Sequence, residues 1–270
     1  MVHRLDSSLD PWLDLVRDAV LGHEPFPGDL IRQRLHETFG VHVMRSWTGR
    51  GDSVGRDTAV PTWPTVEIEP YWLNGGYRRH PATRWYTVSP DLVPITIERV
   101  PTDLVPEKER HRVQEGLIPP EVRQQLTIMY HRSTGDRRLF VLGKSGRDFT
   151  PGDCTLAAQI QPLLALLDRQ ADVLAAVDAE SLATQLGISG RQLAVLELLA
   201  EGLTAQAIGR RLGISARTVQ VHLRRVYRSL GVHDRLLAVR VYDDARRRLD
   251  AAGGPKGPGV EGVADVRNPA

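Results

Sequence analysis

Residues 189–232, SGRQLAVLELLAEGLTAQAIGRRLGISARTVQVHLRRVYRSLGV, contain the pattern that decides the fold of the C-terminal part of the chain. Ser189 stands three residues before Gln192, which is the spacing of a capping box, where two side chains bond free backbone N–H groups at a helix start. Apolar residues recur at helical spacing as far as Glu201, and Gly202 follows. The pattern therefore predicts a helix over 191–201 that begins and ends sharply.

Two more helices are expected directly after the first. Thr204 is a capping residue for a second helix that ends at Leu212, and Ser215 for a third that ends at Leu230, with Gly213 in the turn between them. Spacings of 4, 3 and 4 predict that one face of the third helix is buried. That face carries Val219, Leu223, Val226 and Leu230, and the opposite face carries Arg217, Gln220, Val221, Arg224, Arg225 and Arg228. This layout is typical of a DNA-binding helix-turn-helix.

The charge of the chain is distributed unevenly, although the net charge of its 270 residues is only +2. Residues 187–250 contain twelve arginines and six acids, a balance of +6, so the remainder carries −4. Residues 202–233 contain six arginines and no acid. A solvated helix face is an alternative explanation of such a basic cluster, but the asymmetry is also what nucleic-acid binding requires.

The same segment resembles the LuxR-type helix-turn-helix of bacterial transcription regulators over about 60 residues. The resemblance departs from the family at Gln192, where glutamate is usual, and at Ser229, where lysine is usual. The first change preserves the capping box, and the second removes one phosphate contact. The matching positions are Arg191, Val195, Leu196, Gly202, Ile208, Gly209, Leu212, Gly213, Ile214, Ser215, Thr218, Val219, His222, Tyr227, Leu230, Gly231 and Val232.

The resemblance implies that a helix over 216–230 enters the major groove of double-stranded DNA. Base edges are then expected to face Gln220, Val221 and Arg224, because Gln suits adenine, Arg suits guanine and Val suits a thymine methyl. Phosphates are expected near Ser215, Arg217, Thr218, Arg225, Tyr227 and Arg228, with His222 as a structural or phosphate-side residue. A helix over about 235–249 resembles the family's dimerisation helix, so we expect a homodimer and an inverted-repeat operator, with RNA polymerase as a candidate partner.

The first 150 residues predict an α+β domain built on one antiparallel sheet. Helical spacing covers 9–21 and 28–39, whereas 101–120 is expected to be a charged, loop-rich crossover. The predicted strands cover 41–44, 65–68, 95–97, 126–130 and 138–142, the last two joined as a hairpin. We expect a sensor or dimerisation domain over 1–150, a connecting helix and linker over 151–186, an all-α four-helix DNA-binding domain over 187–250, and a disordered tail over 251–270.

Two interpretations of the connecting helix stay open. Leucines and other apolar residues follow a heptad pattern with Gln170 at the one polar position, which suits either a dimer seam or a helix that covers the sheet of its own domain. Pro162 is expected to kink or restart the helix. The pattern consists of Leu156, Ile160, Leu163, Leu167, Leu174 and Val177.

The N-terminal region also resembles, more diffusely, the GAF-like or PAS-like sensor domains that precede this helix-turn-helix in actinobacterial regulators. The resemblance lies in the strand order and in residues 147–153 ahead of a long helix, and the ratio of 32 arginines to 3 lysines is compatible with a GC-rich genome. A third possibility is that this domain senses nothing and only dimerises.

An aromatic cluster is the candidate site for a small organic ligand in the N-terminal region, although ordinary core packing is the favoured explanation of these residues. The cluster consists of Trp63, Tyr71, Trp72, Tyr77, Trp85 and Tyr86. Autoinducer-binding members of the LuxR family have Trp and Tyr in their pocket, followed by an Asp-Pro pair. The nearest equivalent here is His80-Pro81, so a quorum-sensing autoinducer receptor is kept only as an alternative.

Enzymatic and metal functions are not expected, and no cofactor is predicted. Gly51 to Gly55 match the GxSxG pattern around Ser53, but the segment leads into Pro61 and not into a helix, so an enzyme with a basic appendage is a weak alternative. The nine histidines lack metal-site spacing. No apolar run reaches the length of a membrane helix, and Cys154 is the only cysteine, so a cytoplasmic protein is expected.

Overall fold

The structure is a computed structural model that describes residues 9–22, 26–48, 54–57, 78, 80–133 and 136–252. The chain forms two compact units, which divide between Arg169 and Gln170 inside one long helix, α6 (Pro151–Leu186). This division lies within the connecting segment predicted over 151–186. The domain boundaries predicted after residues 150, 186 and 250 stay predictions.

Unit 1 is built on a five-stranded antiparallel sheet, in which the strands follow the order β2-β1-β5-β4-β3. The predicted α+β class of the N-terminal region is therefore confirmed, whereas its GAF-like or PAS-like character stays a prediction. The strands are β1 (His42–Thr48), β2 (Val54–Asp57), β3 (Ile95–Thr96), β4 (Gln124–Ser133) and β5 (Asp136–Lys144).

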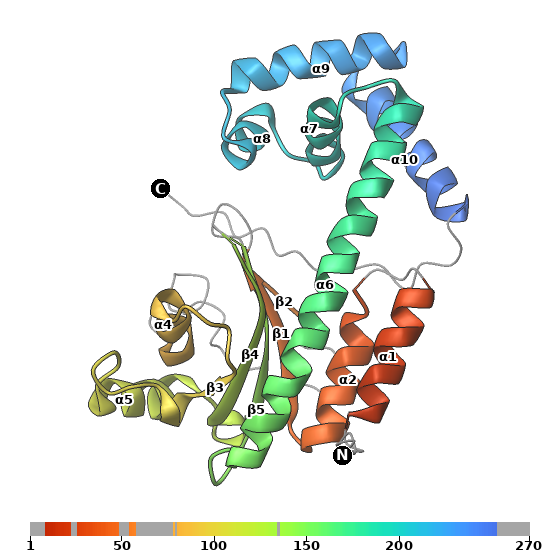
Figure 1. Ribbon diagram of the computed structural model, residues 1–270. Helices are drawn as coiled ribbons and strands as arrows, with labels where there is room; N and C mark the ends of the chain where they lie inside the picture. Colours follow the sequence, from red (N-terminus) through yellow and green to blue (C-terminus); the bar gives the residue numbers. More distant parts are fainter. Residues whose placement is uncertain are drawn as a thin grey trace. The chain divides into compact units, whose positions relative to one another are not determined.

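Helices cover both faces of this sheet, as Figure 1 shows. On one face, α1 (Asp10–Leu21), α2 (Gly28–Phe39) and the first part of α6 bury the larger core, in which Trp12 and Phe140 are almost fully enclosed. On the other face, α4 (Pro81–Val88) and α5 (Glu107–Leu117) pack over two smaller clusters. Two short 3-10 helices, η2 (Ile97–Arg99) and η3 (Pro120–Val122), connect these elements.

Most of the predicted elements of unit 1 are present, but the structure also contains α4, α5 and β2, which were not predicted. The crossover predicted as loop over 101–120 contains α5, which the sequence pattern did not indicate. β2 was not predicted, and the strand predicted over 65–68 lies outside the described residues. The predicted hairpin is confirmed by the pairing of Ser133 with Asp136, although residues 134–135 of its turn also lie outside the described part of the chain.

The connecting helix continues through Pro162, and one of the two interpretations of its heptad pattern holds for the first half of the pattern. The helix runs from Pro151 to Leu186 without a restart at Pro162. Pro162 and Ala158 are exposed, so water can bond the Ala158 carbonyl, which lacks an N–H donor from Pro162. In the predicted heptad pattern, Ile160 and Leu167 are buried in the core of unit 1. This half of the pattern therefore covers the sheet of its own domain, and only the alternative interpretation holds for it.

Unit 2 is a four-helix domain, as predicted, with helices α7 (Gly190–Ala200), α8 (Ala205–Leu212), α9 (Ala216–Leu230) and α10 (Arg235–Ala252). The end of α6 completes its core through Leu182 and Leu186. Ala251 and Ala252, predicted to belong to a disordered tail, are the last two residues of α10. Among the helices that the structure describes, none is long and apolar enough to cross a membrane.

The turn between α8 and α9 depends on a close approach of the backbone at Gly209. A Cβ atom built on this glycine would lie 2.7 Å from the carbonyl oxygen of Ile214 and 3.3 Å from the amide nitrogen of Ala216. A contact of 2.7 Å is shorter than real Cβ atoms show, and both neighbours are backbone atoms that cannot rotate away. Glycine at this position therefore fixes how closely the start of α9 crosses α8.

We expect Gly209→Ala to destabilise unit 2 by about 1–3 kcal/mol, the usual cost of forcing extra volume into a packed interior. Urea unfolding of the full chain, followed by far-UV circular dichroism, would measure the loss. Gly190→Ala is the matched control, because a Cβ at Gly190, in the first turn of α7, meets nothing within 4 Å. Equal stability of the two variants would contradict the role given to Gly209.

Candidate nucleic-acid interface

Each of the three short helices α7, α8 and α9 begins at a side-chain cap that the sequence predicted. At α7, the backbone N–H of Ser189 donates to the Gln192 side chain at 2.7 Å, and the N–H of Gln192 donates to Ser189 Oγ at 3.3 Å. Thr204 caps α8 by accepting from the N–H of Ala207. These caps fix the first residue of each helix and therefore the rotation of its faces.

The cap of α9 lies at the turn of the helix-turn-helix. Ser215 Oγ accepts from the N–H of Thr218 at 3.0 Å and also lies 2.8 Å from the Thr218 hydroxyl. Gly213, with a φ of 67°, ends α8 in the left-handed conformation that glycine adopts without strain. Ser215 and Thr218 thus hold each other at the N-terminal end of α9, and both remain exposed.

The two faces of α9 are separated as predicted. Val219 and Val226 are fully buried, and Leu223 and Leu230 pack against the same core. The opposite face is exposed and carries Arg217, Gln220, Val221, Arg224, Arg225 and Arg228. Within the described part of the chain, none of its four guanidinium groups has a hydrogen-bond or ion-pair partner. This face is therefore a strongly positive surface with free donors.

Other arginines of unit 2 are engaged in holding the fold together. Arg191 donates to the carbonyl of Leu212 at 2.9 Å, where α8 ends, and Arg235 donates to the carbonyl of Leu199 at 2.9 Å, near the end of α7. Arg211 pairs with Glu201 at 3.3 Å. Helix C-termini leave carbonyls unpaired, so the bond from Arg191 satisfies a group at the end of α8. The bond from Arg235 is a second one for the Leu199 carbonyl, which also accepts from the N–H of Gly202 at 3.1 Å.

Two residues predicted to contact DNA are partly enclosed by the domain itself. The ring of Tyr227 packs against the core of unit 2, and burial raises the pKa of its hydroxyl. His222 is half-buried, and its Nδ1 atom has no hydrogen-bond partner within the described residues. Both residues lie beside the arginine face, and their contacts with DNA stay predictions.

The comparisons with known proteins agree with this geometry for the C-terminal segment. Residues 186–242 match the family described as "Bacterial regulatory proteins, luxR family". This segment is a LuxR-family helix-turn-helix domain. With the LuxR-family domain near its C-terminal end, the chain is a DNA-binding transcription regulator.

Similarity over the whole chain is weak. A structure titled "SdiA in complex with octanoyl-rac-glycerol" has 14% identity and a TM-score of 0.42, with 90% of this chain and 97% of that chain covered. A structure of Escherichia coli SdiA has 14% identity and a TM-score of 0.32, with 91% and 93% covered. No curated protein matches the chain. The LuxR-family assignment therefore rests on the helix-turn-helix segment.

The candidate ligand residues of unit 1 are described only in part. Trp63, Tyr71, Trp72 and Tyr77 lie outside the described residues, as does Ser53 of the GxSxG pattern. Tyr86 is 1% exposed, and its hydroxyl lies 3.0 Å from the carbonyls of both Val93 and Thr127. Since these two acceptors already engage its single proton, Tyr86 serves the core, and burial raises its pKa.

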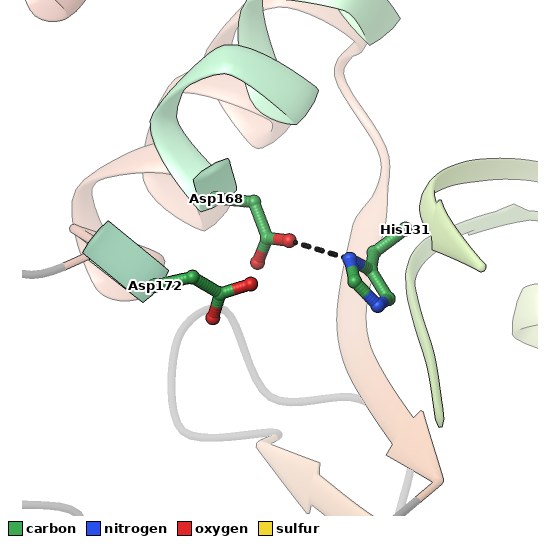
Figure 2. Close-up of side chains that lie close together, drawn as sticks. All are labelled: His131, Asp168 and Asp172. Carbon is green, nitrogen blue, oxygen red and sulfur yellow. Dashed lines mark ion pairs between the residues drawn. The ribbon is translucent and has the colours of Figure 1, made fainter. Parts of the chain in front are cut away.

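The structure also brings together charged residues that the sequence did not group. His131 of β4 and Asp168 of α6 form an ion pair of 3.0 Å, and Asp172 follows Asp168 one helical turn later (Figure 2). The other carboxylate oxygen of Asp168 accepts from Arg138 at 2.7 Å. Because both oxygens of Asp168 are already bonded to basic side chains, this group favours a structural ion-pair network over a metal site. Histidine spacing along the sequence could not indicate it, since the residues lie on different elements.

We expect unit 1 to lose stability as the pH falls from 6.5 towards 4, because of His80. Burial lowers the pKa of His80 from 6.5 to about 4, although its hydrogen bond to Gln125 at 3.0 Å acts in the opposite direction. The unfolded chain takes up a proton near pH 6.5 and the folded one only near 4, so stability falls by up to about 1.4 kcal/mol per pH unit between them.

Urea unfolding between pH 4 and 7 would measure this dependence. His80→Gln should have a flatter profile than the native chain over this range. His111→Gln is the control, because His111 has a side chain that is 69% exposed, and it should keep the native slope. A native slope in His80→Gln would show that another group is responsible.

Proposed function

We propose that this regulator binds an inverted-repeat operator as a homodimer, with α9 in the major groove of each half-site. The observation that carries the proposal is the exposed face of α9, where four arginines without partners in the described chain lie beside Gln220 and Val221. An α-helix fits the major groove, and a fixed row of guanidinium groups suits phosphates and guanine edges.

Different positions on α9 are assigned to reading bases and to binding phosphates. Gln220, Val221 and Arg224 follow one another along the exposed face in the N-terminal part of α9, where recognition helices contact base edges. Arg225 and Arg228 lie further along the helix and are assigned to phosphates, together with Arg217 and the capping hydroxyl of Ser215. Phosphate contacts set the register and make affinity depend on salt, whereas base contacts discriminate sequences.

The proposed dimer contact in unit 2 is the start of α10. Leu236 is 78% exposed and Leu237 is 42% exposed, although both are large apolar residues. A second copy of the same surface would bury them, as in the two-fold contacts that most homodimers use. Two recognition helices related by that two-fold axis would read two half-sites of opposite orientation.

We further propose that a small organic ligand or a partner protein bound to unit 1 controls DNA binding. The aromatic residues that precede Tyr86 in the cluster, from Trp63 to Trp85, support this, since aromatic side chains supply most of the contact area in small-molecule pockets. Native mass spectrometry of the purified full chain would test it. A copurified organic molecule would support ligand control, whereas a protein of unmodified mass with no bound species would favour a partner or a purely dimerising domain.

Arg224→Ala and Arg228→Ala are expected to weaken DNA binding in different ways. The first should cost about 1–3 kcal/mol at the selected operator and relax discrimination at one base position. The second should weaken binding to all sequences and lower the slope of log K against log salt by about one. Fluorescence anisotropy with a selected operator and a scrambled duplex, at several salt concentrations, would separate the two effects.

Arg112→Ala is the matched control for both variants. Arg112 is an exposed residue of α5 in unit 1, so the substitution removes the same charge far from α9 in the sequence. DNA binding by this variant should stay within twofold of the native value, roughly 0.4 kcal/mol. If Arg224→Ala and Arg228→Ala behave like this control, the face assigned to DNA is wrong.

Leu236→Glu is expected to convert the dimer to a monomer, because it would place two like charges in the proposed contact. Size-exclusion chromatography with light scattering would measure the mass, and circular dichroism would verify the fold. Val173→Glu is a control at an exposed apolar residue of α6 and should leave the α10 contact intact. A Leu236→Glu variant that stays dimeric would exclude the α10 contact.

A further inference from the structure

Two neighbouring residues of β4, His131 and Arg132, bind helices on opposite faces of the sheet in unit 1. His131 Nδ1 lies 3.0 Å from the Asp168 carboxylate of α6. Arg132 donates to three carbonyls at the end of α4, those of Tyr86, Ser89 and Pro90, at 2.7–2.9 Å. One short segment of a single strand therefore holds both helices.

A β-bulge explains how adjacent residues reach these positions. Met129 pairs with Leu139 and His131 pairs with Arg138, so Tyr130 is an extra residue with no partner on β5. Tyr130 belongs to the core beneath α6, and Met129 belongs to the cluster beneath α4. If the strand alternated regularly from Met129 through Tyr130, with no bulge, His131 would point to the α4 face. The bulge instead places His131 and its cross-strand neighbour Arg138 together at Asp168.

The contacts on the α6 side satisfy a charge that is almost completely buried. The Asp168 side chain is 3% exposed, and its oxygens bind Arg138 at 2.7 Å and His131 at 3.0 Å. Arg138 also bonds Asp136 at 3.0 Å, which orients the guanidinium group. A buried carboxylate that loses one partner becomes strongly unfavourable, so the position of His131 constrains this part of α6.

The contacts on the α4 side hold the end of that helix. The last carbonyls of a helix have no partner within the helix and carry a partial negative charge. Arg132 binds three carbonyls here with one guanidinium group, and Ser89 follows α4 in an extended conformation. A displacement of the end of α4 would therefore displace Arg132, which follows His131 directly in the chain.

We propose that the β4 bulge at Tyr130 couples α4 to α6. A displacement of the end of α4 then changes the contacts that His131 and Arg138 make with Asp168. Asp168 lies one residue before Arg169, after which α6 passes from unit 1 into the LuxR-family unit. Only an effect of this coupling on DNA binding rests on the proposed function. The coupling itself is a property of unit 1.

Hydrogen–deuterium exchange of the full chain, without DNA, tests the coupling. Arg132→Ala should raise exchange about fivefold at amides of α4 and also at amides of α6 around Asp168. Asp168→Asn, which keeps the shape of the side chain, should raise exchange at the end of α4 as well. In the double variant the increases should fall short of the product of the two single effects, because both substitutions break the same connection.

Arg84→Ala is the matched control on the same helix. It removes a half-buried ion pair of 3.0 Å between Arg84 of α4 and Glu109 of α5, and should raise exchange only in those two helices. If Arg132→Ala does not fold, Arg132→Lys keeps the charge but cannot bond three carbonyls, and the same outcomes apply. Effects of Arg132→Ala confined to α4, or multiplicative effects in the double variant, would overturn the coupling and leave the proposed DNA binding untouched.

Discussion

The close approach of α8 and α9 at Gly209 is the constraint on which the DNA-binding unit depends. The backbone of Ile214 occupies the space that any larger residue at Gly209 would need. With this crossing fixed and Ser215 capping α9, the helix has one orientation, in which Val219 and Val226 are buried. The arginines of the other face then point to solvent in a fixed row, so a steric requirement at one glycine determines where the positive surface lies.

The helix-turn-helix could be predicted almost completely from the sequence because its signals are local. The caps at Ser189, Thr204 and Ser215 act within three residues, and apolar spacing alone separates the faces of α9. Unit 1 was less predictable for an equally physical reason. The face of α5 that packs inward includes Arg110 and Gln114, which bond to Glu98, so no hydrophobic period marked this helix.

Contacts between residues that lie far apart in the sequence could not be predicted either. The meeting of His131, Arg138 and Asp168 requires a strand register, a bulge and a helix packed on the sheet, none of which a spacing along the chain reveals. The heptad pattern of α6 was real, but a period shows only that a face is apolar and not what covers it. For Ile160 and Leu167 the covering surface is the sheet of the same unit.

Arg191 and Arg235 add to the formal charge of unit 2, but their guanidinium groups are bonded within the domain. Both arginines count towards the +6 of residues 187–250, yet each is bonded to a carbonyl at or near the end of a neighbouring helix, and Arg211 is neutralised by Glu201. The number of counterions released from DNA depends on the phosphates contacted and not on the arginines present. Under the proposed function, this unit would therefore hold its operator with fewer ionic contacts than the number of its arginines suggests.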